Sequence, residues 1–179
     1  MEQEFVKFSK MARFSRELIV TEKIDGTNAQ IFIGENGEFL TGSRTRWITS
    51  EDDNYGFARW AQEYKDELMM LGPGRHFGEW WGSKIQRRYG INEKRFSLFN
   101  VKRWAEERPE CCQVVPVLWQ GGFDKLNVDV IIDNLRTHGS VAAPGFMRPE
   151  GIVIFHTQGN FGLKKTLEKD GTGKWDAQL

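Results

Sequence analysis

The chain has 179 residues, of which 39% are hydrophobic and 28% are charged. This balance argues against collagen, a coiled coil or wholesale disorder and indicates a globular chain with a core of its own. The 25 Lys and Arg residues equal the 25 Asp and Glu residues, so overall charge does not draw the chain to a nucleic acid or a membrane surface. No apolar run approaches the roughly 20 residues that span a bilayer. We therefore expect no membrane association and a cytoplasmic location.

The N-terminal part is predicted to form sheet. Residues 18–21 and 29–34 are runs of strand length that are rich in β-branched side chains. The second run leads through Glu35-Asn36-Gly37 into residues 38–41. Because Asn-Gly is a strong hairpin signal, these two runs are predicted to pair.

Residues 52–71 are predicted to form an amphipathic helix that packs on this sheet. Their apolar positions fall three or four residues apart, at Phe57, Trp60, Ala61, Tyr64, Leu68 and Leu71. Gly72-Pro73-Gly74 ends the pattern.

The rest of the chain alternates strand-like runs with a second helix. The runs cover residues 76–81, 96–101, 114–119, 151–155 and 161–165, and the helix covers 128–135 and ends at Gly139. Clustered strands with interposed helices predict an α+β fold with mainly antiparallel sheets and flanking helices. We predict one domain over residues 1–167, a polar C-terminal tail over 168–179, and no separate C-terminal domain.

The most informative stretch is Thr21-Glu22-Lys23-Ile24-Asp25-Gly26-Thr27-Asn28. A lysine at a strand end can act as a nucleophile when cations or a metal nearby favour its neutral form. Gly26 leaves room for a phosphate to approach. Taken alone, Lys-x-Asp-Gly is more often an exposed turn with a solvated lysine.

Further segments follow this lysine in a fixed order: Ser43-Arg44, His76-Phe77-Gly78-Glu79, Phe96-Ser97-Leu98-Phe99, Glu150-Gly151-Ile152-Val153 and Leu163-Lys164-Lys165. Their order and gaps resemble motifs I, Ia, III, IIIa, IV and V of the covalent nucleotidyltransferase superfamily of polynucleotide ligases and RNA-capping enzymes. The resemblance implies the ligase and capping-enzyme nucleotidyltransferase (adenylation) fold.

Within that superfamily the chain looks most like RNA ligases of the phage nick-sealing type (RNA ligase 2). Asn28, five residues after Lys23, is similar to that branch, whereas DNA ligases and capping enzymes usually have Arg there. Two positions depart from the branch. Asp25 stands where its best-known member has His, and Lys164-Lys165-Thr166 replaces the usual lysine, any residue, lysine.

The resemblance implies an ATP-dependent RNA ligase, which acts in the host cytoplasm if it is phage-encoded. Lys23 would form a covalent lysyl-AMP, pass AMP to a 5′-phosphate end, and so allow joining to a 3′-hydroxyl. The expected partner is RNA with such ends in a nicked duplex. Lys164 is implied as the second catalytic residue, a cation beside the α-phosphate. Taken alone, Lys164 is more often a solvated strand lysine.

The residues that the resemblance implies for ATP binding are Glu22, Asn28, Arg44, Glu79, Phe99, Glu150 and Lys164. Phe99 would stack on adenine, Glu22 would read the adenine edge by side chain or backbone, and Glu79 would bind the ribose. Glu150 would hold Mg²⁺ or Mn²⁺ against the phosphates. Considered singly, Phe99 could be a core residue and Glu79 could pair with a basic side chain.

Residues 84–95 carry five cations and one anion, which suits the backbone of RNA. Tyr89 could stack on a base there, and Lys10 and Arg13 could extend the patch. A solvated loop is the plain alternative. Two other functions remain open: a small ATP-dependent DNA ligase, and a catalytically idle module that binds a nucleotide or RNA.

Overall fold

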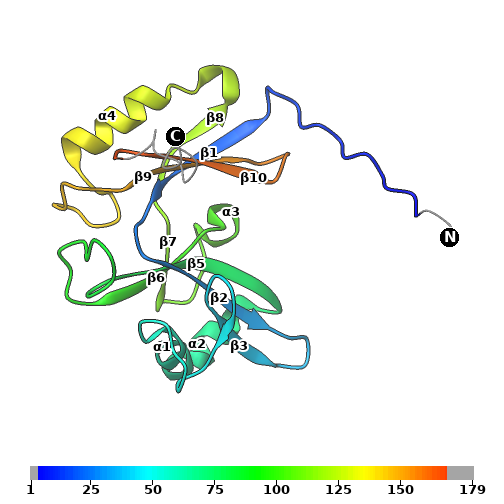
Figure 1. The fold of residues 1–179 in the computed structure, drawn as a ribbon, viewed down its shortest axis with the longest axis vertical. Coiled ribbons are helices and arrows are strands. Elements are labelled where there is room, and N and C mark those ends of the chain that lie inside the picture. Colours follow the sequence, from blue (N-terminus) through cyan, green and yellow to red (C-terminus); the bar gives the residue numbers. More distant parts are fainter. Residues whose placement is uncertain (1–3, 169–179) are drawn as a thin grey trace, which may run out of the picture.

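The computed structural model describes residues 4–168 and contains two β-sheets that lie one above the other (Figure 1). The four-stranded sheet has the order β10-β9-β1-β8. Its strands are β1 (Glu17–Lys23), β8 (Val117–Gly122), β9 (Gly151–His156) and β10 (Phe161–Thr166). All of its neighbouring strands are antiparallel.

The six-stranded sheet has the order β4-β3-β2-β5-β6-β7. Its strands are β2 (Thr27–Ile33), β3 (Phe39–Gly42), β4 (Trp47–Ile48), β5 (Gly74–Gly82), β6 (Lys94–Leu98) and β7 (Cys112–Val114). Only β6 and β7 pair in parallel among the described strands. The predicted α+β class with mainly antiparallel sheets is thus confirmed, as is the hairpin of β2 and β3.

Helices cover the outer faces of both sheets (Figure 1). The α-helices are α1 (Phe57–Glu63), α2 (Lys65–Leu68), α3 (Val101–Trp104) and α4 (Val128–His138), and the 3₁₀ turns are η1 (Met69–Leu71) and η2 (Phe123–Lys125). Beneath the six-stranded sheet, Phe57 of α1 packs on Trp80 and Phe96. Above the four-stranded sheet, α4 packs on Val20 and Ile152.

The single helix predicted over residues 52–71 is wrong in extent. It begins only at Phe57, because the Asp53 carboxylate accepts hydrogen bonds from the backbone N–H groups of Ala58 and Arg59 and Gly56 has a left-handed φ of 82°. It then breaks at Tyr64, whose φ of −99° and ψ of 20° leave the helical region.

Two predicted strands also differ in extent. The run predicted over 96–101 stops at Leu98, because the Asn100 side chain accepts a hydrogen bond from Arg103 N and caps α3. The run predicted over 114–119 is divided at Pro116 between β7 and β8, which belong to different sheets. A proline cannot donate to a strand ladder, so the chain leaves one sheet there and enters the other.

The predicted polar tail lies, beyond Glu168, outside the described residues. The domain boundary at residue 167 therefore stays a prediction. Within residues 4–168, no helix has the length and apolar character needed to cross a membrane.

Candidate active site

The candidate nucleophile ends the central strand of the four-stranded sheet. Lys23 is the last residue of β1 and lies opposite Gly151 at the start of β9. The preceding residue, Glu150, is thereby brought to Lys23 across 127 positions of sequence, and the Lys23 amine donates to Glu150 Oε2 at 2.6 Å. These side chains are only 24% and 16% exposed, so the pair is partly shielded from water.

The turn after Lys23 carries the chain to the other sheet, where Gly26 and Asn28 contact Glu79. The Gly26 N–H donates to Glu79 Oε1 at 3.0 Å, and the Asn28 side-chain amide donates to Glu79 Oε2 at 3.3 Å. A Cβ added to Gly26 would lie 2.4 Å from the Trp80 carbonyl oxygen. Glycine is therefore required by the close approach of two backbones.

Glu79 is buried within β5, next to Trp80. Burial raises the pKa of its carboxyl from the ordinary 4.5 to about 7; the charge of Lys23 and the Gly26 N–H oppose this shift, whereas Glu150 and Asp25 add to it. Near neutral pH this carboxyl can thus accept or donate a hydrogen bond, which suits a hydroxyl-bearing ligand.

Glu22 points away from this cluster. Its carboxylate accepts hydrogen bonds from the Ser140 hydroxyl at 2.6 Å and from the backbone N–H groups of Val141 at 2.8 Å and Ala142 at 2.9 Å. Burial raises the pKa of Glu22, and these hydrogen bonds oppose the rise. The side chain is therefore engaged in holding the loop after α4, on the face of the strand opposite to Lys23.

The inner face of the six-stranded sheet bears exposed aromatic rings beside Glu79. Ser97 of β6 lies opposite Glu79, so Phe99, two residues later, extends along the same face. The Phe99 ring is 41% exposed, and its backbone N–H donates to Phe77, whose ring is 50% exposed. A flat apolar surface is thus available near the Glu79 carboxyl.

The strand register separates the two lysines of the last strand. Lys164 lies opposite Val153, which in turn lies opposite Thr21, so Lys164 is on the same face as Lys23 and two strands away. Lys165 falls in the row of Glu22, on the opposite face. Lys164 is exposed and directed to the side of the sheet where Lys23 lies.

Arg44 lies in the exposed turn between β3 and β4. The last residue of β3, Gly42, pairs with Gln30, two residues from Asn28. The structure thus places Arg44 beyond the Asn28 end of β2, with its side chain in solvent.

Two site residues were not identified from the sequence as supports of the nucleophile's turn. Arg87 Nε donates to Asp25 Oδ2 at 2.9 Å, and the Tyr89 hydroxyl accepts from Asp25 N at 2.7 Å. The Tyr89 side chain is 2% exposed, so the expectation that it stacks on a base is wrong. A tyrosine next to a basic residue gives no sequence signal of such burial.

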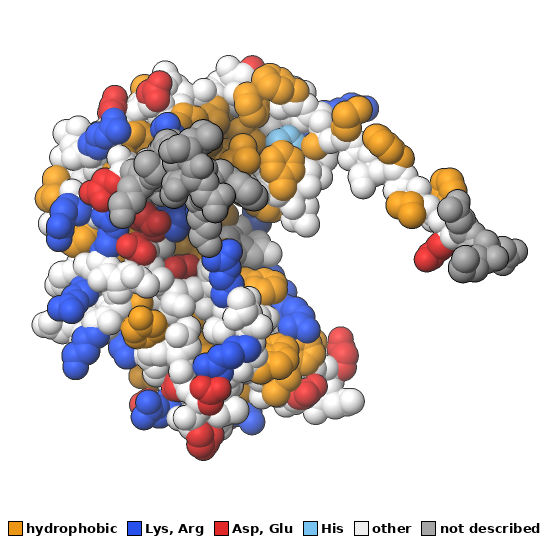
Figure 2. All heavy atoms as spheres, viewed as in Figure 1, with side chains coloured by type: hydrophobic (Ala, Val, Ile, Leu, Met, Phe, Trp, Pro, Cys, Tyr) orange, Lys and Arg blue, Asp and Glu red, His pale blue; other side chains and the backbone are white. Residues whose placement is uncertain are grey.

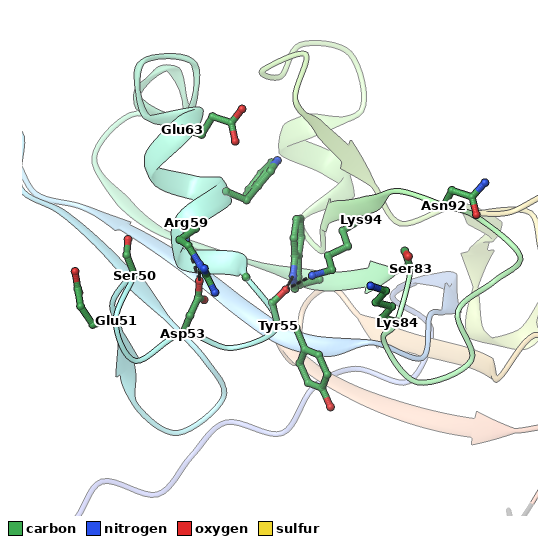
Figure 3. A pocket seen from close by; sticks show the side chains of 13 residues that line it. Ser50, Glu51, Asp53, Tyr55, Arg59, Glu63, Ser83, Lys84, Asn92 and Lys94 are labelled. Carbon is green, nitrogen blue, oxygen red and sulfur yellow. Dashed lines mark hydrogen bonds and ion pairs between the residues drawn. The ribbon is translucent and has the colours of Figure 1, made fainter.

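A hollow of about 880 Å³ lies elsewhere, between α1 and the loop after β5 (Figure 3). Tyr55, Arg59, Lys84 and Lys94 are among its lining residues; the two lysines belong to the segment predicted to bind RNA, and none of the residues predicted to bind ATP lines it. Lys94 donates to the Tyr55 carbonyl oxygen at 2.5 Å and Arg59 pairs with Asp53, so several of its cations are already engaged.

No group of three side chains suited to a metal occurs within the described residues. Glu150 offers a hard, partly buried carboxylate in direct contact with Lys23. A divalent cation held by one carboxylate and by substrate phosphates needs no larger protein cage, so Glu150 fits that role.

Comparison with solved structures shows that the fold is similar to that of an RNA ligase of Naegleria gruberi. A lysine-to-alanine mutant of it with ATP and Mn has a TM-score of 0.63 at 18% identity, over 85% of this chain and 49% of that chain. A glutamate-to-alanine mutant with ATP and Mn has a TM-score of 0.66 at 17% identity, over 87% and 51%. A lysine-to-methionine mutant with AMP and Mn has a TM-score of 0.62 at 18% identity, over 86% and 50%.

These similarities confirm the expected nucleotidyltransferase fold, and the chain spans about half the length of the ligase chains that it matches. Among curated proteins no relative is detected. The family model described as RNA ligase matches residues 16–169, which is most of the chain. The chain therefore belongs to the RNA ligase family.

Proposed function

We propose that the chain is the adenylyl-transferring part of an ATP-dependent RNA ligase and that Lys23 is its nucleophile. Lys23 Nζ attacks the α-phosphorus of ATP, an N–P bond forms, and the bond to pyrophosphate breaks as the amine gives up its proton. The observation that supports this is the contact of Lys23 with Glu150, beside Glu79, at the point where the chain passes between the two sheets. Such transfers depend mainly on positioning and charge neutralisation.

Glu150 holds the amine in place through its 2.6 Å hydrogen bond. We also propose that its carboxylate holds Mg²⁺ or Mn²⁺, which when bound neutralises phosphate charge. Lys164, on the same face as Lys23, supplies a second cation for the α-phosphate.

The inner face of the six-stranded sheet would hold the nucleoside. Phe99 offers its exposed ring to adenine, and Glu79 offers a buried carboxyl to the ribose hydroxyls. Asn28 and Arg44 would contact phosphates at the end of β2. Glu22 acts through its backbone in this proposal, because its carboxylate already holds the 140–142 loop.

The AMP then passes to a 5′-phosphate, and attack by a 3′-hydroxyl joins the two ends and releases AMP. The likeness of the Lys23 to Asn28 stretch to nick-sealing ligases supports nicked duplex RNA as the substrate. The match to the RNA ligase family supports RNA over DNA.

The first test is the mass of the intact protein after incubation with ATP and Mg²⁺ or Mn²⁺. We expect the parent chain to gain one adenylyl group, and Lys23→Ala and Lys23→Arg to gain none, because arginine stays protonated and cannot attack. Lys65→Ala, which removes a helical surface lysine, is the matched control and should be adenylylated normally.

If the parent chain stays unmodified, the only reading left is a catalytically idle module that binds a nucleotide or RNA. An adduct that persists in Lys23→Arg would show that Lys23 is not the nucleophile. The second test compares joining of 5′-phosphorylated nicks that carry either RNA or DNA on the 3′-hydroxyl side, and equal joining of both would favour the DNA ligase alternative.

A further inference from the structure

The residues that precede β1 form an arm that runs out from the four-stranded sheet without joining either sheet (Figure 1). Its large apolar side chains are almost fully exposed, at 87% for Phe5, 86% for Phe8 and 88% for Met11. Contiguous exposed apolar groups of this kind mark a surface that another molecule covers.

The arm has two interleaved three-residue repeats. Large apolar residues recur at Phe5, Phe8, Met11 and Phe14, and basic residues recur at Lys7, Lys10, Arg13 and Arg16. Glu4 is the one acid among residues 4–16. In an extended chain with about three residues per turn, every third residue returns to the same face. The arm can therefore present a mainly aromatic face and a cationic face side by side.

Unpaired nucleic-acid strands match this combination. Their bases stack on aromatic rings while their phosphates pair with Lys and Arg. Another copy of the chain, with equal numbers of acidic and basic residues, offers no such charge complementarity. We propose that residues 4–16 bind single-stranded RNA, an inference that rests on the proposed ligase function and extends it to the grip on unpaired RNA that flanks the nicked duplex.

The root of the arm leads directly into β1, the strand that carries the nucleophile, and is fixed to residues next to that strand. The Phe14 and Phe123 rings have centroids 4.2 Å apart, the Arg13 N–H donates to Gln158 Oε1 at 3.1 Å, and His156 Nε2 lies 3.1 Å from the Arg13 carbonyl oxygen. β1 begins at Glu17 and ends at Lys23, so the root lies about 20 Å from the site end of β1.

The space-filling view shows the arm projecting from the upper half of the molecule, on the side where the surface is hollowed between the two halves (Figure 2). RNA held near the root of the arm would lie about 20 Å from the site end of β1. The arm would retain RNA near the site without taking part in the chemistry.

The test is binding of a fluorescent oligouridylate of about 12 nucleotides to the full chain without ATP, followed by anisotropy over a range of salt concentrations. The apolar variant is Phe5→Ala with Phe8→Ala. We expect it to bind roughly 25-fold more weakly, about fivefold for each lost ring. The basic variant is Lys7→Gln with Lys10→Gln and Arg13→Gln. It should lower the slope of log affinity against log salt by about 2, since each phosphate contact on a single strand contributes about 0.7.

Control variants remove side chains of the same kinds elsewhere: the exposed pair Met70→Ala with Val130→Ala, and the helical cations Lys65→Gln with Arg136→Gln. These should bind RNA as the parent does. A duplex of the same length should bind the arm more weakly, because its bases are stacked on each other and present no free faces.

Adenylylation of Lys23 in each variant separates this inference from the proposed function. Both arm variants should form the adduct as the parent does, which also shows that they fold. If the parent forms no adduct, the proposed function fails and the RNA-binding comparison still stands by itself. The inference is overturned if the arm variants bind single-stranded RNA like the parent, if duplex binds equally well, or if the apolar variant only abolishes a concentration-dependent dimer in sedimentation.

Discussion

The buried carboxyl of Glu79 should make the stability of the protein depend on pH. Its pKa rises from 4.5 to about 7 in the folded protein, mainly through burial. A carboxyl with a raised pKa favours the folded state fully below the unfolded value, and this contribution is lost as pH rises through the folded value. With 1.36 kcal/mol per pKa unit, the loss amounts to about 3 kcal/mol between pH 4 and pH 8.

The assay is urea unfolding of the parent and of Glu79→Gln across that pH range. Glutamine keeps the shape of the side chain and does not titrate, so its own stability lacks this component. The difference between the free energies of unfolding of the two proteins should therefore change by about 3 kcal/mol from pH 4 to pH 8, in favour of Glu79→Gln at the higher pH. Titrating groups that do not interact with Glu79 cancel in this comparison. A difference that stays constant with pH would refute the reasoning.

Three further changes test the framework around the site. Gly26→Ala should lower the stability by about 1–3 kcal/mol, because its Cβ would lie 2.4 Å from the Trp80 carbonyl oxygen; an unchanged melting temperature would contradict the close approach. Glu22→Ala should cost about 2–4 kcal/mol in urea unfolding and expose the 140–142 loop to protease, since three hydrogen bonds are lost; resistance to cleavage would argue against that role. Tyr89→Phe removes the acceptor for Asp25 N and should cost about 1–2 kcal/mol and slow adduct formation, and parental values of both would show that the hydrogen bond is dispensable.

The local pattern of the sequence predicted the strands and the second helix well, because alternation and apolar spacing act over a few residues. It failed where one side chain changes the backbone. Asp53 delays α1, Asn100 starts α3, and Pro116 moves the chain to the other sheet. Each of these changes depends on a hydrogen bond that is made or, at Pro116, cannot be made, and a hydropathy pattern contains no such information.

The candidate site shows the same division. The order of the motifs pointed to Lys23, Glu79 and Glu150, although the spacing of 127 residues between Lys23 and Glu150 says nothing about a 2.6 Å contact. The supporting contacts of Arg87 and Tyr89 with Asp25 depend on how the loop after β5 folds back. Four residues of that loop, Lys84, Gln86, Arg88 and Tyr89, have positive φ, a conformation that residue preferences alone would not indicate.

The order of the strands has a consequence for how the protein forms during synthesis. β1 lies between β8 and β9, so neither of its neighbours exists until more than half of the chain has been made. The strands from β2 to β7 form their own continuous sheet and can assemble first. Lys23 is thus made early, next to a sheet that can already be folded, and its contact with Glu150 can form only when the C-terminal strands have been made.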